Sequence, residues 1–261
     1  MSASVSVIMP TYGRPDRHES AYTSFAKSAY PFREMLVYDD SPEQSTFFTS
    51  LRDPRVRYFY SPERLTIGAK RNALIKLARG AVIAHQDDDD VYAPAYLGEM
   101  IKRLNGDDLV KLSVFNVFDE RDGSRWRWDT RGGSLGRILG AKLSVKIPFL
   151  SSFTTDAAIE TVRWGYGFSY MYRRTLCTVR GVWFPDINLR EDYEFIVRAR
   201  RVGAKMKQID DCADLVWHTV HDRSTSASFP QTRLAGPAPR STTSGALAAF
   251  AGYIENSSSR H

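Results

Sequence analysis

Short apolar runs and segments with helical spacing alternate through the first hundred residues of the chain. Four runs have the length and composition of β-strands, at residues 5–9, 34–38, 56–60 and 81–85. Three segments carry apolar side chains at helical spacing, at residues 17–28, 67–78 and 96–104. This alternation predicts an α/β domain with a mostly parallel sheet flanked by helices. Gly80 fits a C-terminal cap of the second helix, and Pro94 stands near the first turn of the third.

The second half of the chain is less regular and predicts a smaller, mixed sheet. Its expected strands lie at residues 109–118, 168–172 and 213–217. A helix is expected at residues 190–202, ending at Gly203. A turn at Asp122-Gly123 makes residues 125–128 the returning arm of a hairpin. The basic and aromatic alternation of that arm is also compatible with stacking on bases, but the turn favours the hairpin.

These patterns predict one domain, residues 1–223, followed by a tail, residues 224–261. The regular half of the domain covers residues 1–106 and the irregular half residues 107–223. Residues 130–160 carry few signals and suggest a mobile loop over a site. The tail is rich in small and polar residues, so we expect it to be loosely ordered or packed over the domain, with a short helix at residues 245–254.

Composition narrows the class of protein. The 261 residues are 43% hydrophobic, which is enough for one sizeable core. No apolar run has the length of a membrane span and the N-terminus lacks a signal pattern, so the expectation is a soluble cytoplasmic protein. The net charge of +6 is compatible with binding phosphates, an anionic membrane surface or nucleic acid, and selects none of them.

The densest chemical signal is the run of four carboxylates at residues 87–90, which directly follows an apolar strand. Four adjacent carboxylates repel one another, so something positive must hold them together. Mg²⁺ and Mn²⁺ are the plainest candidates, because these cations take oxygen ligands and bridge phosphates. A solvated acidic turn is the alternative. The position at a strand end favours a ligand site, since open α/β sheets bind ligands there.

Polar residues also follow the first two strands, at Pro10-Thr11-Tyr12 and at Asp39-Asp40. Parallel strands bring their carboxyl ends to one edge of the sheet, so these clusters should meet the acidic run and form a nucleotide site. Asp39 can accept a hydrogen bond from a base, Tyr12 can lie against its plane, and Arg71 can face a phosphate or a base carbonyl. A capped turn is the alternative for residues 39–42.

A second acidic cluster, Glu191-Asp192, opens the late helix. Acidic residues at a helix start ordinarily stabilise the positive end of the helix dipole. The functional interpretation is a carboxylate that is ionised at neutral pH and takes a proton from a hydroxyl as a general base.

Together these motifs resemble the inverting family 2 glycosyltransferases of the GT-A fold. The resemblance rests on five motifs in the family's order: Val7-Ile8-Met9-Pro10-Thr11-Tyr12, Val37-Tyr38-Asp39-Asp40-Ser41, Gly68-Ala69-Lys70-Arg71-Asn72 with Ala78-Arg79-Gly80, Asp87 to Asp90 before Pro94, and Glu191-Asp192. Two departures are Lys70, where the family usually has alanine, and Gln86, where it usually has an apolar residue. Lys70 is expected near the donor's phosphates.

The resemblance implies a role for each site residue. The implied nucleotide-binding residues are Pro10, Thr11, Tyr12, Asp39, Arg71, Asp87 and Asp88. Asp89 would bind Mn²⁺ or Mg²⁺, and His218 or His221 would assist it, although a structural histidine is equally expected at either position. Asp192, beside Glu191, would be the base of a single-displacement transfer. Residues 165–167 are candidates for shaping the acceptor pocket.

The resemblance also implies partners. The donor would be a nucleoside-diphosphate sugar, most simply UDP-linked, bound in the half formed by residues 1–106. The acceptor hydroxyl would belong to a glycan, a lipid-linked molecule or another compound, with nucleic acid least favoured and peripheral membrane contact compatible with the charge. The oligomeric state is left open. A nucleotidyltransferase and a catalytically inactive nucleotide-sugar-binding module are the alternatives, and the single glycine after the first strand disfavours the former.

Overall fold

The first strand of the chain lies inside a parallel sheet, as the alternation of strands and helices predicts. The computed structural model describes residues 3–131, 155–224 and 232–234. Its strands are β1 (Val5–Thr11), β2 (Arg33–Asp39), β3 (Val56–Tyr60), β4 (Val82–His85), β5 (Val91–Tyr92), β6 (Leu109–Asp119), β7 (Ser124–Asp129), β8 (Met171–Arg173), β9 (Met206–Asp210), β10 (Val216–Val220) and β11 (Thr232–Arg233). Strands β3, β2, β1 and β4 are neighbours in that order, and all three pairings are parallel.

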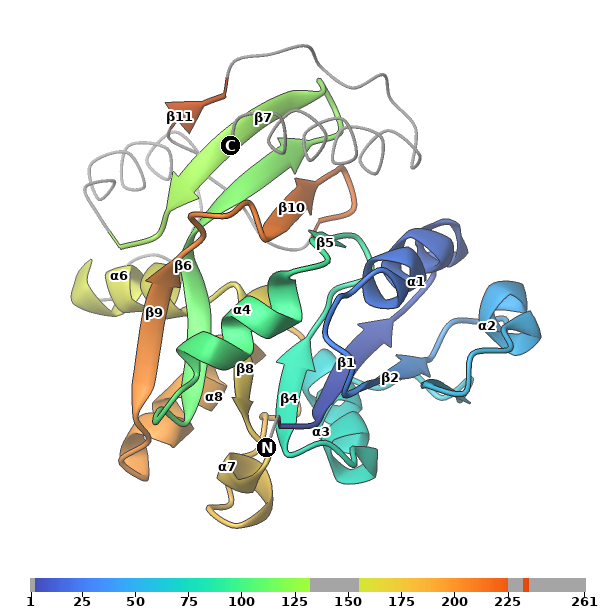
Figure 1. Ribbon diagram of the computed structural model, residues 1–261, viewed down its shortest axis with the longest axis horizontal. Coiled ribbons are helices and arrows are strands. Elements are labelled where there is room, and N and C mark those ends of the chain that lie inside the picture. Colours follow the sequence, from blue (N-terminus) through green and yellow to red (C-terminus); the bar gives the residue numbers. More distant parts are fainter. Residues whose placement is uncertain (1–2, 132–154, 225–231, 235–261) are drawn as a thin grey trace.

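Helices cover both faces of the sheet (Figure 1). They are α1 (His18–Ala26), α2 (Thr46–Ser50), α3 (Ile67–Leu77), α4 (Tyr96–Arg103), α6 (Thr155–Trp164), α7 (Thr175–Thr178) and α8 (Glu191–Arg201), with 3-10 turns at Pro15–Arg17 and Gly167–Ser169. Residues of β1 alternate between two cores, because successive side chains of a strand point to opposite faces. Val7 packs in the cluster that includes α1 and α4, whereas Ile8 packs in the cluster that includes α3 and α8. Burial on both faces explains why these strands are almost wholly apolar.

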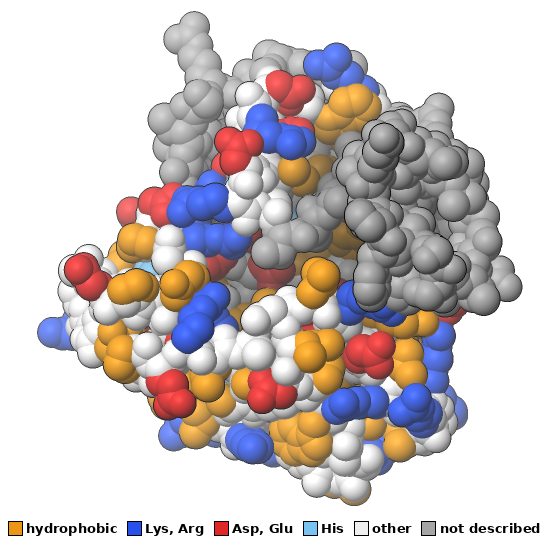
Figure 2. Space-filling model, turned by 180° about the vertical axis from the view of Figure 1, so that it is seen from behind, with side chains coloured by type: hydrophobic (Ala, Val, Ile, Leu, Met, Phe, Trp, Pro, Cys, Tyr) orange, Lys and Arg blue, Asp and Glu red, His pale blue; other side chains and the backbone are white. Residues whose placement is uncertain are grey.

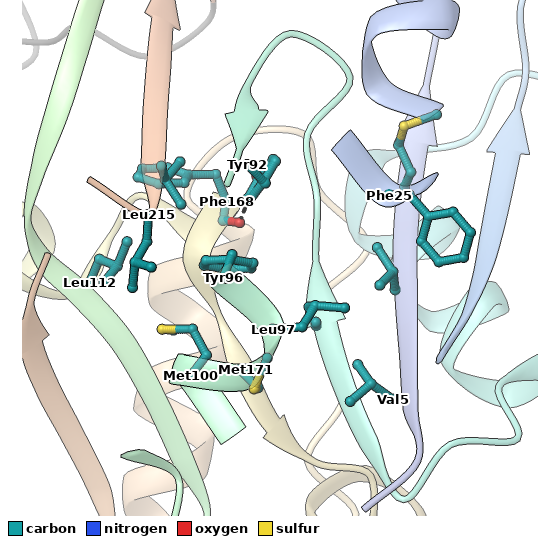
Figure 3. Packing of buried hydrophobic residues seen from close by; sticks show 14 of the residues in the cluster. Val5, Phe25, Tyr92, Tyr96, Leu97, Met100, Leu112, Phe168, Met171 and Leu215 are labelled. Carbon is teal, nitrogen blue, oxygen red and sulfur yellow. Dashed lines mark hydrogen bonds between the residues drawn. The ribbon is translucent and has the colours of Figure 1, made fainter. Parts of the chain in front are cut away.

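The first of these two cores joins the halves of the chain. Tyr96, Leu97 and Met100 of α4 pack there with Phe168 and Met171 from the later half (Figure 3). Within it the Tyr92 hydroxyl donates a hydrogen bond of 3.0 Å to the carbonyl of Phe168. The sheet is therefore continuous from one half to the other.

The second half adds mixed pairings to the same sheet. Strand β8 lies antiparallel between β4 and β6, and β9 and β10 pair with β6 in parallel. The predicted hairpin is confirmed, since β6 and β7 are antiparallel across a tight connection. Trp128 in its returning arm is fully buried and packs against Phe115, as a hairpin strand requires, so it is not free to stack on bases.

Several details differ from the expectations. Gly80 is not a left-handed cap: α3 ends with Ala78 in extended conformation, and a Cβ on Gly80 would lie 2.5 Å from the Ser6 nitrogen. Close packing on β1 is thus the reason for this glycine. The strand expected at 213–217 lies at Val216–Val220, because the Asp211 carboxylate accepts backbone N–H bonds from Ala213, Leu215 and Val216 and holds them in a loop.

Short elements were also missed or displaced. The strand expected at residues 168–172 begins only at Met171, after a 3-10 turn. Strands β5 and β9 and helices α2, α6 and α7 were not predicted. Most of the predicted mobile loop, residues 132–154, and the predicted helix at 245–254 lie outside the described residues. Of the tail, Thr232–Arg233 pairs with β7 as β11, so this part packs onto the domain.

Charge is dispersed over one face of the described surface. Figure 2 shows the face opposite that of Figure 1, where basic and acidic side chains lie interspersed among the described residues. The excess of positive charge therefore does not gather into one patch on the described part of that face. None of the described helices has the length and apolar character needed to cross a lipid bilayer.

Candidate functional site

The carboxyl ends of β1, β2 and β4 meet at one edge of the sheet, as predicted. Thr11 at the end of β1 is the register partner of Asp39 at the end of β2, and the acidic run follows β4. A cavity of about 510 Å³ opens there, a size that suits a small organic ligand. Its lining includes Pro10, Thr11, Tyr12, Gly13, Arg14, Arg64, Ile67, Lys70, Asp87, Asp88, Asp89, Asn188, His218, Thr219, Arg223 and Ser224.

Asp88 and Asp89 are held by a cation that the sequence analysis did not identify. One nitrogen of the Arg14 guanidinium lies 2.7 Å from Asp88 and 2.7 Å from Asp89. Asp88 also accepts a 2.6 Å hydrogen bond from Thr11, and Asp89 lies 2.9 Å from Nε2 of His221. Burial would raise the pKa of Asp89, but the hydrogen bond from His221 and the charge of Arg14 hold this pKa below its ordinary value.

Asp90 pairs with a histidine from the middle of β10. Its buried carboxylate lies 3.0 Å from Nδ1 of His218 and accepts the Thr219 N–H at 2.9 Å. Burial alone would lower the pKa of His218, but Asp90 raises this pKa to about 9. Nε2 of His218 is buried and has no hydrogen-bond partner. The imidazole thus presents an unsatisfied nitrogen beside the cavity.

Asp87 lies 3.7 Å from Arg71, the fourth basic residue that contacts the acidic run. Burial of the Asp87 carboxyl and the charges of the three neighbouring carboxylates raise the pKa of Asp87, while the positive charge of Arg71 lowers it. The Arg71 guanidinium is itself buried and donates to Glu191 at the start of α8. Burial would lower the pKa of Arg71, but Glu191 and Asp87 raise it. Arg71 therefore connects the acidic run to the late helix.

The acidic run has the chemistry of a divalent-cation site. Asp87, Asp89 and Asp90 each offer a carboxylate oxygen, and these oxygens all lie within 4.8 Å of one another. Oxygen ligands of this kind suit Mg²⁺ or Mn²⁺. The residues present fit the predicted cation.

Asp39, which we expected to accept a hydrogen bond from a base, points away from the open part of the site into the protein. Its side chain is fully buried and does not line the cavity. It accepts hydrogen bonds from the Ser41 N–H at 2.9 Å, from the Ser41 hydroxyl, and from Tyr58 at 2.7 Å. The Ser41 hydroxyl in turn accepts the Gly13 N–H at 2.8 Å. These contacts are those of the capped turn, and a role in reading the base remains a prediction.

Asp40 and Lys70 form a buried ion pair beneath the cavity. Nζ of Lys70 lies 2.7 Å from Asp40 and donates to the Thr11 carbonyl at 3.0 Å. Arg64 also reaches Asp40, at 2.7 Å, and its guanidinium lies 3.3 Å over the Tyr12 ring. Lys70 thus lines the cavity as expected, with its charge already paired. Arg14 and Arg64 could have been suspected from the basic residues that follow the first and third strands.

Glu191 and Asp192 lie at the first turn of α8, as predicted. Arg190 precedes them in a left-handed conformation, with φ of 67°, and its side chain makes no capping bond. Asp192 accepts the N–H of Gly167 at 3.1 Å and that of Tyr193 at 2.7 Å. A Cβ on Gly167 would lie 2.9 Å from Cβ of Asp192, so only glycine fits here. Neither Glu191 nor Asp192 lines the cavity, and neither does Arg71, which pairs with Glu191 and with the lining residue Asp87.

Comparison with known proteins gives a family and a fold. The sequence model described as "Glycosyl transferase family 2" matches residues 6–163, which is more than half of the chain. The chain is 36% identical over 94 residues to the putative colanic acid biosynthesis glycosyl transferase WcaA of Escherichia coli K12, covering 34% of each chain. It is 32% identical over 90 residues to the E. coli glucosyltransferase WfgD, covering 34% of this chain and 36% of that one. The match spans about a third of the length of these curated relatives.

Solved structures agree on the architecture. S. aureus TarS residues 1–349 in complex with UDP-GlcNAc superposes with a TM-score of 0.60 at 18% identity, over 87% of this chain and 62% of that one. The mannosyltransferase PcManGT of Pyrobaculum calidifontis, in complex with GDP-Man and Mn²⁺, gives a TM-score of 0.57 at 18% identity, over 85% and 59%. The predicted α/β fold of the GT-A type, with its curled and mostly parallel sheet, is therefore confirmed.

Proposed function

The chain belongs to glycosyl transferase family 2, and from that premise we propose that it transfers a sugar from a nucleoside-diphosphate sugar to an acceptor hydroxyl with inversion. The observation that carries the proposal is the cavity at the strand ends, where cationic side chains and three carboxylates surround a space of ligand size. Arg71 lies between Asp87 of this cavity and Glu191, the neighbour of the proposed base at the start of α8.

The donor is most simply UDP-linked. The solved TarS structures hold UDP-GlcNAc or UDP, and the name of WfgD describes a UDP-Glc-dependent glucosyltransferase. PcManGT holds GDP-Man, so the fold also accepts guanine. WfgD is named for a diphosphoundecaprenol-linked acceptor, which supports a glycan or lipid-linked hydroxyl as acceptor for this chain.

Asp192 would act as the general base. It would take the proton of the acceptor hydroxyl while that oxygen bonds to the anomeric carbon, and the bond from this carbon to the diphosphate oxygen would break with its electron pair. The two backbone N–H groups that donate to Asp192 would keep the carboxylate oriented. Glu191, bound to Arg71, would hold the start of α8 against the donor site.

A divalent cation fits the carboxylates of Asp87, Asp89 and Asp90. When bound, it would supply positive charge opposite the departing diphosphate. The chain's own residues would hold the rest of the donor. Thr11 and Tyr12 line the cavity on the side of β1, and Lys70 of α3 lines it as well.

A thermal-shift screen of UDP, GDP and TDP with Mn²⁺ tests the donor site. A diphosphate at one hundred times its dissociation constant stabilises the folded state by about 2.7 kcal/mol, which raises the melting temperature by several degrees in a domain of this size. We expect UDP to give the largest shift. No shift with any of the three would overturn the proposed donor site.

Turnover separates the remaining alternatives. Release of UDP from a UDP-sugar in the presence of a saccharide acceptor supports the transferase. Pyrophosphate release from a sugar phosphate and a nucleoside triphosphate would instead indicate a nucleotidyltransferase. Tight UDP binding with no turnover of UDP-sugars on any acceptor, water included, would indicate a binding module.

A further inference from the structure

Arg14 forms ion pairs with two carboxylates of the acidic run, where a divalent cation would also bind. One of its guanidinium nitrogens lies 2.7 Å from both Asp88 and Asp89, and the other donates to the Arg223 carbonyl at 3.2 Å. Asp89 also belongs to the trio of carboxylates whose oxygens gather within 4.8 Å. Asp89 would therefore be a ligand both of a divalent cation held by that trio and of the Arg14 guanidinium.

Of the basic side chains that hold the acidic run, Arg14 is best placed to leave it. The Arg71 side chain is only 3% exposed and is also bound to Glu191, and His218 lies between Asp90 and the ring of Phe168. Arg14 is 20% exposed and lines the cavity. It stands in the short loop between β1 and the 3-10 turn at Pro15–Arg17, next to Gly13, whose φ of +63° suits a turn.

We propose that Arg14 is a resident counter-cation of the acidic run, and that a divalent cation binds by displacing it from Asp89. The proposal rests on the proposed function, because it assumes that the diphosphate of the donor binds in this cavity. The displaced guanidinium stays on the wall of the cavity, where it can pair with diphosphate oxygens. The diphosphate thus favours the displaced position of Arg14, and cation and nucleotide bind more tightly together than either does alone.

The physical reason is a competition of charges. Arg14 supplies two charge-assisted hydrogen bonds that bare carboxylates would lack, so it stabilises the acidic run in the absence of a metal. The same contacts must break before Asp89 can serve as a metal ligand. Coupling between two sites through one shared element typically changes affinity by about 5- to 150-fold.

The test is Mn²⁺ binding by isothermal titration calorimetry, first without nucleotide and then with saturating UDP. Without nucleotide, Arg14→Gln should bind Mn²⁺ about tenfold more tightly than the parent. The factor by which UDP tightens Mn²⁺ binding should shrink by a similar amount. Arg14→Lys keeps the charge but carries it on a more flexible side chain without the second nitrogen that donates to the Arg223 carbonyl, so its Mn²⁺ affinity should fall between the two.

Arg64→Gln is the matched control. It removes one positive charge from the same cavity, but Arg64 contacts Asp40 and Tyr12 and not the acidic run. Its Mn²⁺ affinity should stay within about twofold of the parent's, because a more distant charge is screened. If Arg64→Gln gained as much Mn²⁺ affinity as Arg14→Gln, the gain would come from the lower net charge alone, and the proposal would be overturned.

Two further outcomes decide the matter. Unchanged or weaker Mn²⁺ binding by Arg14→Gln would show that the guanidinium does not compete for Asp89. If Arg14→Gln is less stable than the parent, Mn²⁺ should raise its melting temperature by more than it raises the parent's, and the absence of that larger rise would also overturn the proposal. The titration without nucleotide needs neither turnover nor a known donor, so its failure is distinct from failure of the proposed function.

Discussion

Replacing Asp192 by asparagine separates a catalytic carboxylate from a structural one. The carboxylate accepts two backbone N–H groups, those of Gly167 and Tyr193. An asparagine oxygen can accept only one of them, so the variant should lose about 0.5–1.5 kcal/mol of unfolding free energy. A domain with about 5–15 kcal/mol of stability remains folded after such a loss.

The expected loss of activity is much larger. Removing a general base lowers turnover by a factor of about 10² to 10⁴, or roughly 3–5 kcal/mol in the activation barrier. Donor binding should barely change, because the base acts in the transition state. The measurement is the rate of UDP release from saturating UDP-sugar, with a saccharide or water as acceptor, beside a urea unfolding curve.

Glu194→Gln is the matched control, since Glu194 lies in the same first turn of α8 and meets the same helix dipole. If Asp192 only stabilised the helix start, both variants would lose a few tenths of a kcal/mol to about 1 kcal/mol of stability and keep their turnover. A turnover for Asp192→Asn within about tenfold of the parent's would refute the reasoning and remove Asp192 from the proposed mechanism.

Three other expectations follow from the structure. Asp39→Ala leaves the buried donors of Ser41 and Tyr58 without an acceptor, so urea unfolding should show that the variant loses about 2–4 kcal/mol of unfolding free energy. Its UDP binding should also be weaker. Tyr58→Phe should lose less unfolding free energy, and an Asp39→Ala variant as stable as the parent would contradict this expectation. The free energy of unfolding should rise between pH 7 and pH 10.5 through the buried amine of Lys111, and Lys111→Met should lack that rise. Chelation of divalent cations should weaken UDP binding in calorimetry, and an unchanged affinity would argue against a metal-assisted site.

The sign of the Lys111 effect follows from proton counting. Burial lowers the pKa of Lys111 to about 7 in the folded protein, against 10.5 for an exposed lysine. Its Nζ donates to the Arg163 and Gly165 carbonyls at the end of α6. Between these two pH values the unfolded chain holds a proton that the folded chain lacks, so stability rises with pH and is flat outside the window. Equal slopes for parent and variant would contradict the shift.

Residue pattern alone was sufficient for the fold class and for the edge of the sheet at which the polar strand ends meet. Apolar runs with breaks define β1, β2 and β4, and a strand's direction is fixed by chain order once helices connect the strands. The carboxyl ends of such strands must share an edge, so the meeting of Thr11 with Asp39 and the acidic run needed no coordinates. The motifs that resemble family 2 glycosyltransferases lie at those ends, and the family is confirmed.

Elements without their own pattern could not be predicted in this way. Helix α7 has four residues, and β5 has two. Each depends on neighbours from other parts of the chain, because a single turn or a short edge is unstable alone. The later start of β10 also depends on a tertiary contact. The Asp211 carboxylate accepts hydrogen bonds from backbone N–H groups that the sequence pattern assigned to the start of a strand.

Only the tertiary structure decided how the four carboxylates are held. The sequence required a positive partner and suggested a metal, whereas the fold brings Arg14, Arg71, His218 and His221 to them from both ends of the chain. It likewise buried Asp39 among the donors of Ser41 and Tyr58. Coulomb and hydrogen-bond energies depend on separations of a few ångströms in space, and sheet register and loop course set those separations between residues that lie far apart in the sequence.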